Sequence, residues 1–533
     1  MGWESLTHTW HYVENWAQKR PDEEALVFET DRLSWKDFKN EMDAIAKSLL
    51  EIGVEKGDRV ALLSMARTEF PTIYMASNKI GAMWLGLNPK FTLDELLYQV
   101  KDCKPSVLIA VRDFQENDLS DTLKSIMAEC PFIKKLLVIG EPFEGSEGFR
   151  EFIDRGRSSM DSALEERAES VSDTDDALLM YTSGSTGKPK GVVHTHRSIV
   201  ENIKVEVKKF YFHEGARGLL HFPINHVAAD VEIGFGAILA GGCLVFMDRF
   251  DPAESIRMIE KENLNFLGQV PVMYLLEFQQ PAFRETDMGA MELFAWAGSA
   301  APEIMVDVLS GISEKSGASL ITGYGSTETC GFVTYTEKGD DREALLHTAG
   351  KIAPPFELKI VDDRRKELPD GEIGEIAVRG DFMFNRYWNK PEETAKVLDS
   401  DGWYYTSDLA FRDERGYIHI TGRRTEMFKT GGENVYPREI EEVLEMHGSV
   451  LFAAVISVPD DLYQEVGWAF IMLQPGKEAE EKDLVELCRD KLANYKVPKN
   501  FFIRPGLPLL PNGKINKVAL KEESLNILKK EQE

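Results

Sequence analysis

The sequence contains few cysteines, and none of them forms a C-x-x-C pair. Its five cysteines, in a chain of 533 residues, are scattered and odd in number. This pattern argues against a disulfide framework or a cysteine-based zinc site and favours reduced thiols in a cytoplasmic protein. The sequence also lacks an apolar run long enough to cross a membrane, and its first residues lack the apolar core of a signal peptide. We therefore expect a cytoplasmic protein without stable membrane insertion.

Basic residues are the second deficit of the sequence. The 62 lysines and arginines are outnumbered by 90 aspartates and glutamates, and the formal net charge is -28. The field of such a surface repels nucleic acids and anionic lipids, so we expect neither as a partner. An anionic small molecule is repelled at long range as well. Any site for such a molecule must therefore be built from local groups.

What the sequence does contain is an alternation of short apolar runs with helical patterns. The apolar runs at 59–65, 106–111, 243–248 and 265–271 predict buried strands. The segment 35–53, among others, has apolar residues at spacings of three and four, which indicates a helix. Strands that alternate with helices predict an α/β fold with doubly wound parallel sheets. The chain is longer than one core usually supports, so we expect at least two domains.

The last part of the chain has a different pattern. After Gly422 come a charged turn, a glycine pair and a helix that begins near Pro437, a residue suited to the first helical turn. Two strands and a helix over 482–498 follow. We predict a large domain over residues 1–422 and a small α+β domain over residues 423–533.

The stretch YTSGSTGKPKG, at residues 181–191, combines glycines and hydroxyls with two lysines. Its free backbone N–H groups suit an anion such as phosphate. It is not a Walker A loop, because Pro189 follows Lys188 and the preceding glycine, Gly184, is too close. The β-branched residues after it predict that the loop joins two strands. By composition alone, a polar hairpin tip explains the loop equally well.

Four further motifs follow this loop in a fixed order. They are YGSTE at 324–328, YYTSDLA at 404–410, GRRTEMFKTGGENVYPREIE at 422–441 and LPNGKINK at 510–517. Together the five motifs resemble the signatures of the acyl-adenylate-forming superfamily, and the chain is most similar to its AMP-forming acyl-CoA synthetases. The resemblance extends from about Trp10 to Leu520. It implies a large N-terminal domain of doubly wound sheets with a β-rich subdomain, followed by a small mobile C-terminal domain.

The resemblance also implies a reaction and its ligands. A small-molecule carboxylic acid attacks the α-phosphate of ATP, and the thiol of coenzyme A then displaces AMP from the acyl-adenylate. ATP, Mg2+ and coenzyme A are the implied cofactors. The resemblance assigns ATP and AMP binding to residues of the motifs: Thr182, Ser183, Gly184, Ser185, Thr186, Gly187, Lys188, Lys190, Gly298, Ser299, Gly323, Tyr324, Gly325, Ser326, Thr327, Glu328, Asp408, Arg423 and Lys514.

Several of these residues have a more specific implied role. Tyr324 is expected to stack on adenine, and Asp408 to accept hydrogen bonds from the ribose hydroxyls. Glu328 and Thr182 are the implied magnesium ligands, since Mg2+ binds hard oxygen ligands. Lys514 is expected to bridge the substrate carboxylate and the α-phosphate. Taken without their motifs, Lys190 and Lys514 would be interpreted as solvent-exposed lysines.

The acyl group is expected to contact the residues His226, Val231, Trp296, Gly298, Gly325 and Phe332. This lining is neutral and mostly apolar, which favours a fatty, aromatic or alicyclic acid. His226, also an implied catalytic residue, stands where amino-acid-activating relatives have an aspartate that pairs with the substrate ammonium. Asp230 replaces that aspartate only if its helix turns it inward. The alternative interpretation of His226 is a helix cap or a core residue.

Gly431 and Gly432 are implied to face coenzyme A during the second half-reaction, because a backbone without side chains lets the pantetheine arm pass closely. The implied hinge is Thr425, where the family usually has Asp or Lys. Gln464 stands where the family often has glycine.

Three rival functions remain: loading a carrier protein, luciferase-like oxygenation, and nucleotide binding without catalysis. The sequence leaves the oligomeric state open, a homodimer included.

Overall fold

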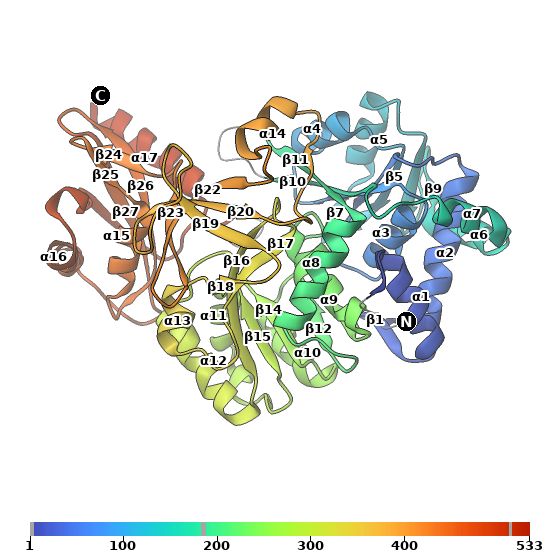
Figure 1. Cartoon of the computed structure of the whole chain (residues 1–533), viewed down its shortest axis with the longest axis horizontal. Helices are drawn as coiled ribbons and strands as arrows, with labels where there is room; N and C mark the ends of the chain where they lie inside the picture. The colour runs from blue at the N-terminus through green and yellow to red at the C-terminus, as the bar shows by residue number, and fades with distance from the viewer. Residues whose placement is uncertain (1–4, 183–187, 511–513, 533) are drawn as a thin grey trace.

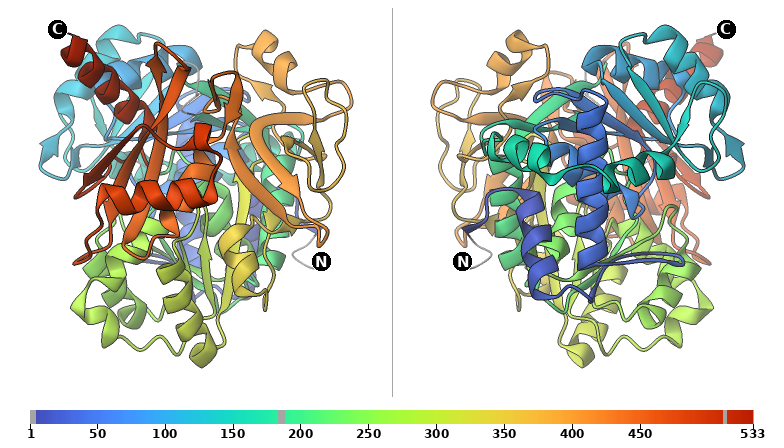
Figure 2. Two further views of the ribbon diagram at one scale, coloured as in Figure 1. Left: turned by 90° about the vertical axis from the view of Figure 1, so that its left-hand side faces the viewer. Right: turned by 90° about the vertical axis from the view of Figure 1, so that its right-hand side faces the viewer.

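The computed structural model of the chain describes residues 5–182, 188–510 and 514–532. The N-terminal elements and the C-terminal elements lie at opposite sides of the molecule (Figure 1). Figure 2 shows these two sides in turn, with the C-terminal elements in front in the left view. The mixed α/β architecture predicted from the sequence is confirmed.

The first large sheet is mainly parallel. From β1 to β16 its neighbours are parallel, and antiparallel strands close both edges. In spatial order it contains β18 (Lys351–Ile352), β17 (Gly331–Tyr335), β16 (Ser319–Ser326), β15 (Leu293–Trp296), β14 (Phe266–Gln269), β12 (Arg217–Leu220), β13 (Cys243–Phe246), β1 (Glu24–Phe28) and β2 (Asp31–Ser34).

The second large sheet has a parallel centre and an antiparallel hairpin that carries the glycine-rich loop. In spatial order it contains β21 (Arg386–Tyr387), β11 (Lys190–Thr195), β10 (Asp176–Thr182), β4 (Met83–Leu87), β3 (Arg59–Leu63), β5 (Val107–Val111), β8 (Lys135–Ile139) and β9 (Glu147–Gly148). β3, β5, β13 and β14 occupy the four apolar runs predicted to be strands, so that prediction is confirmed.

Two smaller sheets complete the strand layout. An antiparallel sheet contains β19 (Glu357–Val361), β20 (Gly374–Arg379), β22 (Tyr404–Arg412) and β23 (Ile418–Arg423). The C-terminal sheet contains β25 (Glu433–Val435), β24 (Phe428–Thr430), β27 (Gln464–Leu473), β26 (Val450–Asp460) and β28 (Asn500–Arg504). β6 (Asp113–Phe114) and β7 (Asn117–Asp118) form a short separate pair.

Helices surround these sheets, and most of them, although not the helix Pro391–Val397, bury an apolar stripe. They are α1 (Thr9–Lys19), α2 (Trp35–Glu51), α3 (Glu69–Lys79), α4 (Leu93–Cys103), α5 (Ser120–Glu129), α6 (Phe149–Arg157), α7 (Asp161–Glu169), α8 (His196–Lys209), α9 (Ile233–Ala240), α10 (Pro252–Lys261), α11 (Pro271–Phe278), α12 (Glu303–Ser316), α13 (Arg342–His347), α14 (Pro391–Val397), α15 (Pro437–Glu445), α16 (Glu481–Lys491) and α17 (Lys517–Gln532), with the short turns η2 (Ala228–Glu232), η3 (Pro281–Arg284) and η4 (Asn494–Lys496).

The predicted helix over 35–53 is α2, and its start has a local cause. The Ser34 hydroxyl accepts a hydrogen bond from the Asp37 backbone N–H at 3.1 Å, and the Asp37 carboxylate accepts one from the Ser34 N–H at 3.4 Å. This reciprocal pair satisfies two N–H groups that a helix start leaves without partners. α2 and its neighbours bury Trp10, Trp35 and Trp84 in the main core, each at most 1% exposed.

The C-terminal sheet has apolar clusters of its own. α15 begins at Pro437, as predicted, and buries Ile440 and Leu444. The helix predicted over 482–498 was wrong in length: α16 ends at Lys491, because Leu492 takes an extended backbone and packs on the domain core. The predicted domain boundary, after residue 422, falls at the end of β23 and stays a prediction.

Candidate active site

The glycine-rich loop lies at the tip of the β10–β11 hairpin. Thr182 is paired in register with Lys190, which confirms that the loop joins two antiparallel strands. The Thr182 hydroxyl donates to the Lys190 carbonyl at 3.4 Å. The residues predicted to hold phosphate between them, Ser183, Gly184, Ser185, Thr186 and Gly187, lie outside the described residues.

The two lysines of the loop have different surroundings. Lys190 Nζ forms an ion pair with Glu393 Oε2 at 2.9 Å and lies 5.0 Å from the centre of the Tyr387 ring. Lys188 is exposed, with Nζ 5.3 Å from the centre of the Tyr98 ring. Lys188 is therefore the more exposed of the two loop lysines. The phosphate contact of either lysine stays a prediction.

Glu328 lies just after β16 and is oriented by β21. The Tyr387 hydroxyl donates to Glu328 Oε1 at 2.8 Å, and the Phe384 N–H donates to the Glu328 carbonyl at 2.9 Å. His194 Nε2 donates to the neighbouring Thr327 carbonyl at 2.7 Å, which ties this turn to β11. The structure thus holds a carboxylate next to the strand that carries the loop.

Three predicted nucleotide-binding residues from distant motifs are in direct contact. The Tyr324 hydroxyl donates to Asp408 Oδ2 at 2.6 Å, and Arg423 Nε forms an ion pair with Asp408 Oδ1 at 3.0 Å. Asp408 is 6% exposed. The Asp408 carboxylate raises the pKa of Arg423, which therefore remains a cation. A carboxylate has about four lone-pair sites, so Asp408 keeps acceptor capacity for two further hydroxyl donors.

Lys514 reaches this group from the C-terminal segment. A Cβ placed on Gly298 would lie only 3.0 Å from Lys514 Cε, so the bare glycine makes room for the lysine chain. Burial is the largest effect that lowers the pKa of Lys514, and Arg423 lowers it further. Asp408 and Glu232 act in the opposite direction. Lys514 therefore lies within electrostatic reach of groups from β22, β23 and η2.

His226 lies at the start of the helical segment that contains η2. Its Nδ1 accepts a hydrogen bond from the Ala228 N–H at 3.2 Å, so the capping interpretation of this residue is correct for one ring nitrogen. Burial, followed by the charge of Lys514, lowers the pKa of His226 to about 4. His226 is therefore a neutral polar ring at physiological pH, close to the lysine.

The remaining predicted lining residues do not share one apolar cluster: Trp296 packs in one, and Val231 and Phe332 pack in another. Trp296 ends β15 and is 2% exposed, and Val231 and Phe332 are also buried. Gly323 and Gly325 lie where β16 approaches β17: added Cβ atoms would lie 2.2 Å and 2.1 Å from backbone oxygens of β17. Their glycine identity is therefore required by strand packing. Ser299 is exposed beside Gly298, and Ser326 accepts a hydrogen bond from the Thr329 N–H at 3.3 Å.

The structure buries acidic side chains on the segment that follows His226, and for Asp230 this is the inward orientation that the sequence left open. Asp230 is turned inward and is fully buried, because the segment Ala228–Glu232 is a π turn rather than an α-helical one. Glu232 and, from α8, Glu206 are buried nearby. An α-helical interpretation of the sequence does not reveal this orientation. A π turn inside a helix is rare and frequently occurs at functional sites.

The predicted coenzyme A loop lies on the outside of the molecule. Gly431 and Gly432 are exposed and have positive φ angles of 60° and 93°. Apart from its two chain neighbours, no described residue has a heavy atom within 4 Å of a Cβ placed on Gly432. Thr425, the predicted hinge, is exposed in the turn between β23 and β24. Gln464 has a φ of 71°. Glycine adopts positive φ angles without steric cost, which explains a preference for glycine at this position.

The chain matches two family models. The model described as AMP-binding enzyme matches residues 13–388, and the model described as AMP-binding enzyme C-terminal domain matches residues 439–514. Together they include most of the residues described above. The chain belongs to the AMP-binding enzyme family.

Relatives of this AMP-binding enzyme align over nearly its whole length. It is 30% identical to the mitochondrial medium-chain acyl-CoA ligase ACSF2 of Danio rerio, over 95% of this chain and 87% of the relative. It superimposes with a TM-score of 0.86 on the anthranilate CoA ligase AuaEII in complex with anthranoyl-AMP, at 26% identity, over 97% of this chain and 98% of that one. With ATP-bound MatB from Rhodopseudomonas palustris the TM-score is 0.83, at 28% identity, over 98% and 99% of the two chains.

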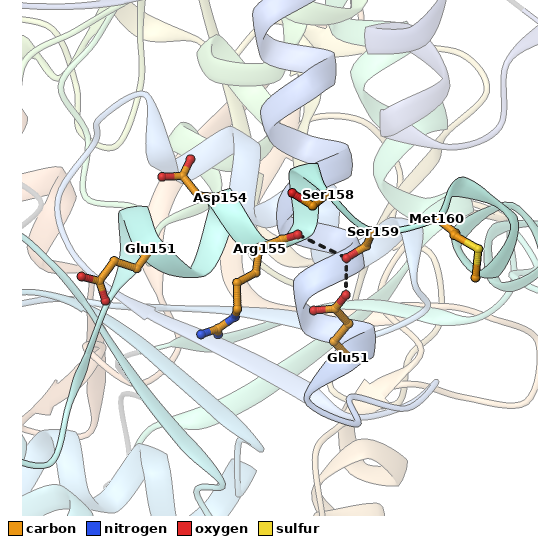
Figure 3. Close-up of a pocket in the computed structure, with 7 residues that line it drawn as sticks. All are labelled: Glu51, Glu151, Asp154, Arg155, Ser158, Ser159 and Met160. Carbon is orange, nitrogen blue, oxygen red and sulfur yellow. Dashed lines mark hydrogen bonds between the residues drawn. The ribbon is translucent and has the colours of Figure 1, made fainter.

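Within the described ranges, the structure has no helix of the length and apolar character required to cross a membrane. A surface depression between α2 and α6 is lined by Glu51, Arg155 and Ser159, among others (Figure 3). The Ser159 hydroxyl donates to Glu51 there. None of the predicted site residues lines this depression, so we do not place the active site in it.

Proposed function

We propose that this AMP-binding enzyme is an AMP-forming carboxylate–CoA ligase. The carboxylate attacks the α-phosphate of ATP, the bond to the leaving pyrophosphate breaks, and an acyl-adenylate forms. The thiol of coenzyme A then attacks the acyl carbon, loses its proton, and displaces AMP. The observation that carries this proposal is the position of Lys514, which lies against Gly298 and within electrostatic reach of Asp408 and His226.

The first half-reaction brings two anions together, and the surrounding residues suit this task. Lys514 supplies a cation where the carboxylate and the α-phosphate would meet, and Arg423 supplies a second cation held by Asp408. A preorganised cation is worth most where negative charge gathers in the transition state. Asp408 would accept the ribose hydroxyls, and the hairpin loop would hold the phosphates that leave.

The oxygen donors next to the loop fit a magnesium ion. Mg2+ is usually held by one or two carboxylates together with water and substrate phosphates. Among the described residues there is no group of three or more His, Cys, Asp or Glu that could hold a metal, which agrees with a site completed by the nucleotide. Glu328 and Thr182 would hold the ion, and it would neutralise charge on the phosphates. The hydrogen bond from Tyr387 keeps the Glu328 carboxylate oriented.

The choice of coenzyme A as acceptor is supported by relatives whose names identify them as CoA ligases. We assign residues 1–422 to the nucleotide and acyl sites and residues 423–533 to a domain that turns about Thr425. The contact of Lys514 with Gly298 and the exposure of Gly431 and Gly432 support the assignment of the present arrangement to adenylation. Rotation would exchange them for the thiol step.

Product analysis tests the proposed function. With ATP, Mg2+, coenzyme A and a panel of carboxylic acids, we expect AMP and pyrophosphate in equal amounts together with an acyl-CoA thioester. Formation of ADP and phosphate would refute the proposed reaction. Acyl-adenylate that is released without thioester formation would instead indicate that the acceptor is not coenzyme A.

Replacement of Gly432 with leucine is expected to slow the thiol step while adenylation changes little. The side chain has open space in the present arrangement, whereas it would obstruct the pantetheine arm after rotation. We expect a loss of at least about tenfold in thioester formation from supplied acyl-adenylate, roughly 1.4 kcal/mol or more in the barrier. Single-turnover measurement of each half-reaction checks this.

The control for this variant is Gly432→Ala, which shares the strain of a positive φ but adds little bulk. If alanine and leucine impair the thiol step equally, backbone strain rather than obstruction is the cause. Equal losses in both half-reactions would contradict the placement of this loop.

A further inference from the structure

Lys517 connects the segment that carries Lys514 to the turn that contains the predicted hinge. It begins α17, three residues after Lys514. Its Nζ forms ion pairs with Glu426 Oε2 at 2.7 Å and with Glu441 Oε1 at 2.8 Å. Glu426 directly follows the predicted hinge residue, Thr425, and Glu441 lies on α15. One ammonium therefore joins three segments of the C-terminal part of the chain.

The residue on the other side of the predicted hinge is held by the sheet that precedes it. Arg424 Nη2 lies 3.0 Å from Asp363 Oδ1 and 3.4 Å from Glu375 Oε2. Glu375 belongs to β20 and is buried, so it offers a fixed anchor. Thr425 therefore lies between an arginine that is paired with this sheet and a glutamate that is paired with Lys517. The turn has a defined position relative to both sides of the hinge.

Backbone hydrogen bonds make the segment around Lys514 continuous with Lys517. The Leu510 N–H donates to the Lys514 carbonyl at 2.7 Å, and the Asn516 N–H donates to the Pro508 carbonyl at 2.8 Å. Lys517 follows Asn516 directly, so its two ion pairs fix the end of this segment. A change in the position of Lys517 would therefore move the backbone from which the Lys514 side chain extends into the site.

Neutralisation of a buried charge explains only one of the two ion pairs. The Glu441 side chain is 5% exposed and therefore requires partners, but two others are present. The Val455 N–H donates to Glu441 Oε1 at 2.8 Å, and Arg438 Nη1 lies 3.7 Å from Oε2. The Glu426 side chain is 37% exposed and has access to water. A pair with such a carboxylate contributes little to stability, so a role in positioning explains it better.

We propose that Lys517 is a positioning residue for adenylation, which holds the Lys514 segment in a fixed place relative to the hinge turn. This inference rests on the proposed function. Arg424 fixes the turn to the sheet before the hinge, and the pair between Glu426 and Lys517 extends this fixed position to Lys514. Lys517 and Glu426 both follow the hinge, so they rotate together. In the thiol step Lys514 has left the site, and its exact position no longer affects the rate.

The variant Lys517→Met tests the proposal in the full-length enzyme, because methionine keeps an unbranched side chain but removes the charge. The substrate is the acid of the panel above that the wild-type enzyme converts fastest. At saturating ATP we expect the single-turnover rate of adenylation to fall by at least about tenfold, since a small misplacement of a reacting group is costly. KM for ATP should change by less than about threefold, as expected when an interaction specific to the transition state is lost. Thioester formation from supplied acyl-adenylate should stay near the wild-type rate.

The pH profile of adenylation distinguishes displacement of Lys514 from a general loss of stability. The charged or titratable groups that interact with its ammonium include Arg423, Asp408, Glu232 and His226. Burial at this place is the largest effect on the pKa of Lys514 and lowers it. A lysine that spends more time outside this place has a pKa nearer the usual 10.5. The alkaline decline of adenylation should therefore move to higher pH in Lys517→Met.

Two further variants separate the hinge contact from the charge of a lysine in general. Glu426→Gln removes the contact with the turn but keeps the pair between Lys517 and Glu441. We expect it to slow adenylation alone by at least about threefold, in line with the loss of one partly exposed ion pair. The matched control is Lys496→Met, because Lys496 Nζ pairs with the α15 residue Glu439 at 2.5 Å and 2.7 Å from its two oxygens, away from the hinge turn. This control should leave both half-reactions unchanged.

The outcomes separate this inference from the function on which it rests. A folded Lys517→Met variant that adenylates at the wild-type rate would overturn the inference alone, and so would equal losses in both half-reactions. Melting temperatures report folding. If Lys517→Met does not fold, Glu426→Gln decides the question by the same two criteria. If the wild-type enzyme yields no AMP and thioester with any acid, the proposed function fails, and this inference fails with it.

Discussion

Replacement of Lys514 with alanine is expected to lower the rate of acyl-adenylate formation by roughly a hundred- to a thousandfold. Loss of one well-placed group that stabilises transition-state charge typically costs about 3 to 4 kcal/mol. Lys514 is positioned for this role, since it passes over Gly298 and lies within electrostatic reach of Asp408, Arg423 and Glu232. The measurement is single-turnover formation of acyl-adenylate in the absence of coenzyme A.

The second half-reaction provides the internal control for this variant. Supplied acyl-adenylate and coenzyme A should give thioester at near the wild-type rate, because the rotated domain carries Lys514 away from the acyl carbon. Lys521→Ala is the control lysine, since its ammonium donates to Ser457 in the same domain at 3.1 Å. Normal adenylation by Lys514→Ala, or an equal loss in both steps, would contradict the assigned role.

The pH dependence of the adenylation rate should reflect the protonation state of the same lysine. Burial and Arg423 place the pKa of Lys514 below its usual value of 10.5. Its ammonium is therefore lost at a lower pH than in an exposed lysine, and adenylation should fall as the pH rises through that pKa. This alkaline decline should be absent in Lys514→Ala.

Replacement of Glu328 with glutamine is expected to slow adenylation by at least about a hundredfold and to raise the Mg2+ concentration required. Glutamine keeps the size of the side chain but removes the anionic ligand. A bound metal ion typically stabilises the charge of the transition state by several kcal/mol. Titration of the adenylation rate with Mg2+ measures both effects. An unchanged Mg2+ dependence would exclude Glu328 as a ligand.

Tyr387→Phe is the matched control for this variant. It removes the hydroxyl that donates to Glu328 Oε1 at 2.8 Å but leaves the carboxylate in place. We expect a loss below about tenfold, in line with the modest net contribution of a single hydrogen bond. A loss as large as that of Glu328→Gln would indicate that orientation rather than charge is decisive.

The fold was largely predictable because its signals are local. A buried parallel strand is a short apolar run, and β3, β5, β13 and β14 lie where such runs occur. A helix start is set by residues within one turn, as at Pro437 of α15. The end of α16 was not predictable in this way. It depends on Leu492 reaching the core of the C-terminal domain, a contact with elements distant in the sequence.

The motifs by themselves determined the family and the candidate site, because residue identity at fixed spacing carries the chemistry of phosphate, ribose and carboxylate recognition. Tertiary structure alone decided how these residues meet. Asp408 joins Tyr324 to Arg423 across two sheets, and Lys514 reaches Gly298 only through the docking of the C-terminal elements.

The burial of Asn202, Glu206 and Asp230 is decided wholly by the tertiary structure. Asn202 and Glu206 are four residues apart on α8, a spacing that a solvent-exposed polar face shows equally well. Only the packing of α8 against η2 and β17 buries them. Asp230 turns inward because a π turn changes the direction of the side chains that follow, and sequence periodicity assumes an α-helix. The sequence therefore determined that this chain is built to activate a carboxylate, whereas the packing of distant elements decided which of its acidic side chains are buried.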